Sequence, residues 1–126
     1  MDGNERSIVA FASSAHALVH TYELSIPIFV VVWLQEFGAS TTQLGLAVTG
    51  GYALFGIGAL PGGVLADRFG SRRLVAGDLI GMGLSFLALS FANGLVAVAL
   101  ALAGWGVAAS VYHPAALSLL STGVEN

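Results

Sequence analysis

Four long apolar stretches restrict this chain to a membrane-embedded fold. They cover residues 8–34, 44–66, 74–91 and 95–120, and only 9% of the 126 residues are charged. A soluble domain usually carries about 25% charged residues, so this sequence lacks the polar surface that water requires. A helix needs about 20 apolar residues to cross a hydrocarbon core, and the stretches match that length. Period-two alternation is absent, which favours helices over a β-barrel.

We therefore expect an all-α polytopic membrane protein with four transmembrane helices. These helices are expected over about 8–35, 43–67, 73–92 and 95–120, within a single transmembrane unit that includes residues 1–126. The first apolar stretch is too long for the core of a signal peptide. The chain has no cysteine, which excludes disulfides and thiolate chemistry, and it has no basic patch typical of nucleic-acid binding. No cofactor is indicated.

The arginines determine the expected orientation. The chain has four basic residues, all arginine: Arg6, Arg68, Arg72 and Arg73. In a four-helix topology all of them fall on the side that holds the N-terminus, the 67–73 link and the C-terminus, and the opposite side has none. Cytoplasmic segments carry an excess of Lys and Arg. We therefore expect an integral protein of the plasma membrane whose N-terminus and 67–73 link are cytoplasmic.

The link between the second and third helices carries a specific motif. Residues 63–73, GVLADRFGSRR, fit G-x-x-x-D-R-x-G-x-R-R at every fixed position. This motif resembles the signature loop between helices two and three of the major facilitator superfamily. The resemblance implies a cytoplasmic gate that holds one alternating-access state, partly against a helix of the second half of the transporter. The candidate gating residues are Gly63, Asp67, Arg68, Gly70, Arg72 and Arg73.

Three residues of this region have an expected physical role. Gly63 removes a side chain where the second helix is expected to meet another helix closely. Gly70 permits the chain reversal that a short cytoplasmic turn needs. Asp78, at the start of the third helix, either titrates in a transport pathway or is attracted to the nearby arginines, and we favour the attraction.

The first helix carries an ionisable face. His16, His20, Glu23 and Pro27 follow i, i+4, i+7 and i+11 spacing, which places them on one side of a helix. Ionisable groups are costly in a membrane and usually face a cavity or a partner. The pattern predicts a proton-coupling or substrate-binding stripe, and the alternative is a hydrogen-bonded seam between helices. We favour the first for Glu23, and both stay open for the two histidines. No metal site is predicted, because no third ligand cluster accompanies the histidines.

The fourth helix contributes Tyr112, His113 and Pro114 among small and aliphatic residues. Tyr112 and His113 join the candidate proton or substrate site, and Pro114 is expected to bend the helix. The run SVYHPAA resembles the fosmidomycin-resistance branch of the superfamily, as does a histidine-bearing first helix that contains Pro27. Many drug/proton antiporters of the superfamily carry an arginine near the start of the fourth helix. Here no basic residue follows Arg73, so that coupling route is absent.

The resemblance implies twelve helices in two halves, with the substrate between them. This chain would supply the first third, an incomplete N-terminal half. We expect part of a secondary active transporter, not an enzyme, with proton-coupled efflux of a small molecule. Its expected partners are the lipid bilayer, the substrate, protons, and the remaining helices or a second copy. Two alternatives stay open: a four-helix small multidrug-resistance-type dimer, in which Glu23 would be essential, and a non-transporting subunit or relic.

Overall fold

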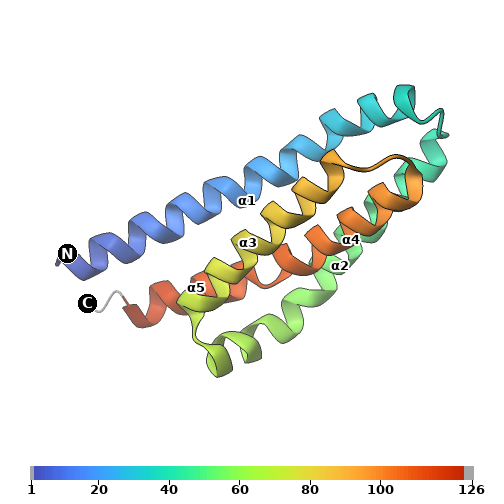
Figure 1. Ribbon diagram of the computed structural model, residues 1–126. Coiled ribbons are helices and arrows are strands. Elements are labelled where there is room, and N and C mark those ends of the chain that lie inside the picture. The colour runs from blue at the N-terminus through green and yellow to red at the C-terminus, as the bar shows by residue number, and fades with distance from the viewer. Residues whose placement is uncertain (1, 124–126) are drawn as a thin grey trace.

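The computed structural model describes residues 2–123 and folds them into helices joined by short links (Figure 1). The helices are α1 (Gly3–Glu36), α2 (Thr41–Phe69), α3 (Ser71–Ser90), α4 (Leu95–Ser110) and α5 (Tyr112–Gly123). Within this part of the chain α4 and α5 together form one apolar segment, and four segments are long and apolar enough to cross a membrane. The expected all-α fold with four transmembrane segments is confirmed. The C-terminal residues 124–126, expected on the cytoplasmic side, lie outside the described residues.

Capping boxes begin the first two helices. At the start of α1 the Asp2 side chain accepts from the Glu5 amide, and the Glu5 side chain accepts from the Asp2 amide, each at 2.8 Å. Ser40 and Gln43 exchange the same pair of hydrogen bonds at the start of α2. Such boxes satisfy amides that have no partner inside the helix. They fix where each helix begins.

A seam of small residues joins α2 to α4 and α5. Gly51, Gly58 and Gly62 of α2 face Gly106, Ser110 and Pro114 across this seam. A Cβ added at Gly51 would lie 2.9 Å from the Leu102 carbonyl oxygen, and one at Gly62 would lie 2.6 Å from Pro114 Cγ. Without those side chains the helix backbones approach closely, which is how membrane helices gain packing energy. We call these six residues the glycine seam.

The close contact expected at Gly63 occurs at Gly62 instead. A Cβ added at Gly63 would meet nothing within 4 Å, so the prediction for Gly63 is wrong within residues 2–123. Neighbouring positions on a helix differ by about 100° in direction. Small residues occur almost all around α2, so the sequence pattern did not fix the rotation of this helix.

The first helix packs through one heptad-spaced row. Ala12, Val19, Ile26 and Trp33 are buried and follow one another at seven-residue intervals. Apolar side chains such as Leu24 remain 70% exposed on the other faces, as expected for a helix that meets lipid. The start of α1 and the end of α5 lie at the same end of the bundle (Figure 1). This arrangement places the ionisable face of α1 beside α5.

The fourth apolar segment is broken at Val111. The sequence predicts one helix over 95–120, whereas the structure has α4 ending at Ser110 and α5 beginning at Tyr112. Pro114 has no amide hydrogen to donate to the Ser110 carbonyl, which weakens the helix at that turn. The break directly precedes Tyr112 and His113, so it sets the direction in which both side chains project from α5.

Candidate functional site

Five polar residues predicted from the sequence meet between α1 and α5. They are His16, His20, Glu23, Tyr112 and His113, and we call them the polar cluster. The His16 ring lies 4.4 Å from the His20 ring and 6.0 Å from the His113 ring, measured between centroids. His20 and His113 are also 6.0 Å apart. Three imidazoles from two helices that are far apart in sequence therefore occupy one site.

Glu23 extends the polar cluster along α1. Its Oε2 lies 2.8 Å from His20 Nδ1, with side-chain exposures of 24% for Glu23 and 37% for His20. Tyr112 closes the other end, with its ring 5.2 Å from the His113 ring and 6.0 Å from the His16 ring. The cluster thus joins a carboxylate, three imidazoles and a phenol by short steps. Imidazoles and carboxylates are the side chains that proteins most often use to accept and donate protons.

Two tyrosine hydroxyls attach neighbouring helices to the main chain of α1. The Tyr112 hydroxyl donates to the Ala12 carbonyl at 2.9 Å, and the Tyr52 hydroxyl donates to the Glu23 carbonyl at 3.3 Å. Pro27 has no amide hydrogen and so cannot donate to the Glu23 carbonyl four residues before it. Tyr52 supplies the hydrogen bond that Pro27 withholds.

Aromatic residues that the sequence did not single out lie beside the polar cluster. Phe55 stacks on Trp105 at 5.8 Å and meets the His113 ring edge-on at 6.2 Å. Tyr52 packs against the other side of this group, 5.2 Å from Trp105. The sequence feature that points to a donor such as Tyr52 is Pro27, because it leaves the Glu23 carbonyl without its helical hydrogen bond. No signal identified Phe55 or Trp105, because aromatic residues are common in apolar helices.

A groove of about 320 Å³ opens on three members of the polar cluster, His16, Tyr112 and His113. Its lining residues come from α1 and α5: Ala12, Ser13, His16, Tyr112, His113, Ala116, Leu117 and Leu120. This volume is at the lower end of the range for small-molecule pockets, which combine apolar walls with few polar groups. Within residues 2–123 no group of three His, Asp or Glu side chains has a geometry that could hold a metal ion.

A single residue joins α2 to α3. Gly70 has φ +86°, a left-handed conformation that glycine adopts without a steric penalty. Its amide donates to the Ala66 carbonyl at 3.0 Å, and its own carbonyl accepts from the Leu74 amide at 3.1 Å. Gly70 is thus the end of one helix and the start of the next. The reversal expected at this residue takes place with no further linking residues.

The sequence of this helical bundle matches a known family over almost its whole length. The family model of the Major Facilitator Superfamily covers residues 9–123. The chain belongs to the Major Facilitator Superfamily. Members of this superfamily are membrane transporters rather than enzymes, and four apolar membrane segments agree with that membership.

Two curated proteins are similar to this superfamily member. The puromycin resistance protein pur8 of Streptomyces alboniger is 38% identical over 88 residues, which cover 70% of this chain and 18% of that protein. A Na(+), Li(+), K(+)/H(+) antiporter of Planococcus maritimus is 28% identical over 109 residues, which cover 80% of this chain and 24% of that protein. The matched region is less than a quarter of either relative. No solved structure matches the chain significantly.

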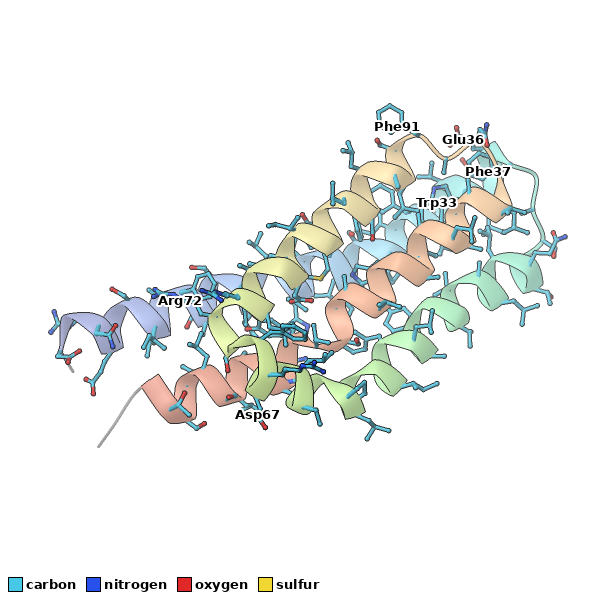
Figure 2. All side chains as sticks on the ribbon, turned by 60° about the horizontal axis from the view of Figure 1, so that its bottom comes forward. Trp33, Glu36, Phe37, Asp67, Arg72 and Phe91 are labelled. Atoms are coloured by element: carbon cyan, nitrogen blue, oxygen red, sulfur yellow. The ribbon has the colours of Figure 1, made fainter. Side chains whose placement is uncertain are left out.

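In this major facilitator chain the charged residues of the 67–73 link, which we call the hinge, do not pair with one another. Arg72 lies over the Phe11 ring of α1 at 5.9 Å, and Arg68 lies over the Phe69 ring at 5.7 Å. Asp67 is exposed, and no ion pair to it occurs within residues 2–123. Figure 2 shows Arg72 beside α1 and Asp67 elsewhere at the same end of the bundle, far from Trp33.

Asp78 is buried away from the hinge arginines. Its side chain is 3% exposed, and neither carboxyl oxygen has a hydrogen-bond partner among the described residues. The favoured interpretation, attraction to the arginines of the hinge, is therefore wrong. The side chains of Arg72 and Arg68 instead lie over aromatic rings. Asp78 is close to the arginines in sequence, which suggested the pairing. The rotation of α3 instead directs its side chain into the bundle.

Proposed function

We propose that this chain supplies the first four helices of a proton-coupled small-molecule exporter of the major facilitator type. The observation that carries the proposal is the meeting of the polar cluster between α1 and α5, where three of its members, His16, Tyr112 and His113, line one groove. Two features support it further: the family match over residues 9–123, and relatives named for drug resistance and for cation/proton antiport. The remaining helices would complete the substrate site.

In this proposal Glu23 is the residue that takes up and releases the coupling proton. Its 2.8 Å contact with His20 is an ion pair when His20 carries the shared proton and a neutral hydrogen bond when Glu23 carries it. His16 and His113 are close enough for charge on His20 to act on them. Protonation of Glu23 removes the attraction that holds a charged His20, so the proton changes the interaction between α1 and α5.

The 67–73 hinge is the proposed cytoplasmic gate. Asp67 is exposed and has no ion-pair partner within residues 2–123, as expected if its partner belongs to the second half of a transporter. The orientation with the N-terminus and hinge in the cytoplasm rests on the placement of the four arginines. The proposed location is the plasma membrane. Assignment to the fosmidomycin-resistance branch rests on the SVYHPAA run and the histidines of α1.

The coupling role is tested by Glu23→Gln in the full-length transporter, with Glu36→Gln as the matched control. Glu36 is an exposed residue of the same helix at the opposite end from the hinge (Figure 2). Puromycin and Na⁺ are the probes, chosen from the names of the relatives. We expect Glu23→Gln to abolish efflux driven by a pH gradient in proteoliposomes and to retain substrate exchange without a gradient. Wild-type gradient-driven efflux by Glu23→Gln would refute the coupling role.

The gate is tested separately by Asp67→Asn. We expect impaired transport with unchanged membrane insertion, measured as the amount of protein in the membrane fraction. Transport at the wild-type rate would contradict the gate.

The place of the chain in a larger transporter is tested by its gene. A reading frame that continues into further apolar spans would support the proposal. A stop codon after residue 126, together with proton-linked efflux by the purified chain alone, would favour the small dimeric transporter instead. The family match favours the larger transporter.

A further inference from the structure

The most unusual buried group of the molecule is the carboxyl of Asp78. The side chain is 3% exposed in the middle of helix packing, and both Oδ1 and Oδ2 have no hydrogen-bond partner within residues 2–123. Buried polar groups in proteins are hydrogen-bonded in the large majority of cases. A hydrogen bond between helices therefore does not explain why this carboxyl is buried.

The groups around Asp78 offer no positive charge. Helix α3 packs against α1, α2, α4 and α5, and the charge of Asp78 acts on the phenol of Tyr112 on α5. The hydrogen of that phenol is already donated to the Ala12 carbonyl. On α3 itself, Arg72 lies over the Phe11 ring and does not bond to Asp78. The described part of the chain supplies neither a cation nor a donor.

An ionised carboxylate in such a place is far costlier than a neutral acid. A buried charge without a partner carries a desolvation penalty that proteins avoid by neutralising the group. A protonated carboxyl carries no net charge, so its burial without a partner costs far less than burial of the carboxylate. The environment of Asp78 thus suits a bound proton; within residues 2–123 no group of three carboxylate or imidazole side chains is placed to hold a metal ion.

We propose that Asp78 is a proton-binding site that is separate from the polar cluster, and that the packing of α3 against α5 holds its proton in place. Release requires water to reach the carboxyl. The O–H bond of Asp78 then breaks, the proton passes to a water oxygen, and the carboxylate that remains is solvated. Protonated Asp78 favours the packing seen here, and ionised Asp78 favours separation of α3 from α5. This inference does not rest on the transport role of Glu23.

The protonation state is tested by infrared spectroscopy of the chain in lipid nanodiscs. The chain contains three aspartates, Asp2, Asp67 and Asp78, and the first two are exposed. A variant with Asp2→Asn and Asp67→Asn leaves Asp78 as the single aspartate without altering the buried site. When aspartate is isotope-labelled at its carboxyl carbon, the spectrum reports Asp78 alone. We expect the carbonyl stretch of a protonated acid at neutral pH, lost only in alkaline solution. A carboxylate band at neutral pH would overturn the proposal.

The link to helix packing is tested with a cysteine reporter, because the chain has no native cysteine. Ser118 of α5 accepts a hydrogen bond from Ser71 of α3 at 2.8 Å, so Ser118→Cys reports the contact of the two helices. Ser121→Cys, on the exposed face one turn later, corrects for the effect of pH on thiol reactivity. We expect the ratio of alkylation rates, Cys at 118 over Cys at 121, to rise when the acid band disappears. In Asp78→Asn the ratio should not change with pH. A constant ratio in the wild-type background, or the same rise in Asp78→Asn, would overturn the coupling to packing.

Discussion

The hydroxyl of Tyr52 should contribute more to stability than its long hydrogen bond indicates. It donates to the Glu23 carbonyl at 3.3 Å, whereas the Tyr112 hydroxyl donates to the Ala12 carbonyl at 2.9 Å. By distance alone, Tyr112→Phe should be the costlier change. The helical context reverses this order, because Pro27 deprives the Glu23 carbonyl of its usual donor, and Tyr52→Phe would leave that oxygen unsatisfied.

The stability cost of each substitution depends on the hydrogen bonds that the carbonyl keeps after the tyrosine hydroxyl is lost. Ala12 lies inside α1 with an ordinary residue four positions later, so its carbonyl keeps a helical bond when Tyr112 loses its hydroxyl. The loss is then that of an ordinary interhelical hydrogen bond in a membrane protein, about 0.6 kcal/mol. A buried acceptor left without a partner costs about 1–3 kcal/mol. We expect Tyr52→Phe to fall near the middle of that range, about 2 kcal/mol.

A double-mutant cycle with Pro27→Ala separates this explanation from simple contact strength. Alanine restores an amide hydrogen that can donate to the Glu23 carbonyl, so the hydroxyl of Tyr52 becomes dispensable. The free energy of unfolding is measured in bicelles for the wild type, the two single variants and the double variant. In the Pro27→Ala background Tyr52→Phe should cost about 0.6 kcal/mol, the same as Tyr112→Phe. An unchanged cost of Tyr52→Phe in that background would refute the reasoning.

Two further predictions concern glycines whose neighbours differ. In the glycine seam, a Cβ at Gly106 would meet the backbone of Gly51, so Gly106→Ala should lower the free energy of unfolding by about 1–3 kcal/mol. At Gly50 a Cβ would meet nothing within 4 Å, and Gly50→Ala should leave stability unchanged or raise it; equal effects of the two changes in thermal unfolding would contradict the seam. Gly70→Ala should destabilise by about 1–2 kcal/mol because alanine is strained at φ +86°. Gly63→Ala, at an open helical position, is the control, and a loss of the same size there would show that the torsion of Gly70 is not the cause.

The broad architecture follows from one-dimensional features of the sequence. Stretches of about 20 apolar residues specify membrane helices, and a glycine between two helical segments marks a reversal that other residues adopt only with strain. The spacing of His16, His20 and Glu23 correctly predicts a shared helical face, because the helical repeat is fixed by backbone geometry. These features depend on local chemistry and needed no knowledge of the neighbours.

What the sequence did not specify depends on how each helix is rotated. The difference between Gly62 and Gly63 is a matter of one residue in helical phase, and the burial of Asp78 away from the arginines likewise depends on the rotation of its helix. Helices in lipid are apolar on most faces, so the hydrophobic pattern that fixes rotation in soluble proteins is weak here. The arrival of Tyr112 and His113 beside α1 likewise depends on the break at Val111.

The hydrogen bonds from Tyr52 and Tyr112 to the main chain have a consequence for which substitutions α1 can accept. Both hydroxyls bond to carbonyl oxygens of the α1 backbone, and neither bonds to an α1 side chain. The side chain at position 23 can therefore be exchanged without removing the group to which Tyr52 attaches, whereas the burial of Ala12 restricts its replacement. A chain built in this way can acquire a different ionisable residue in place of Glu23 while the hydrogen bond from Tyr52 to the main chain of α1 is kept. Evolution and protein engineering have the same freedom at this position.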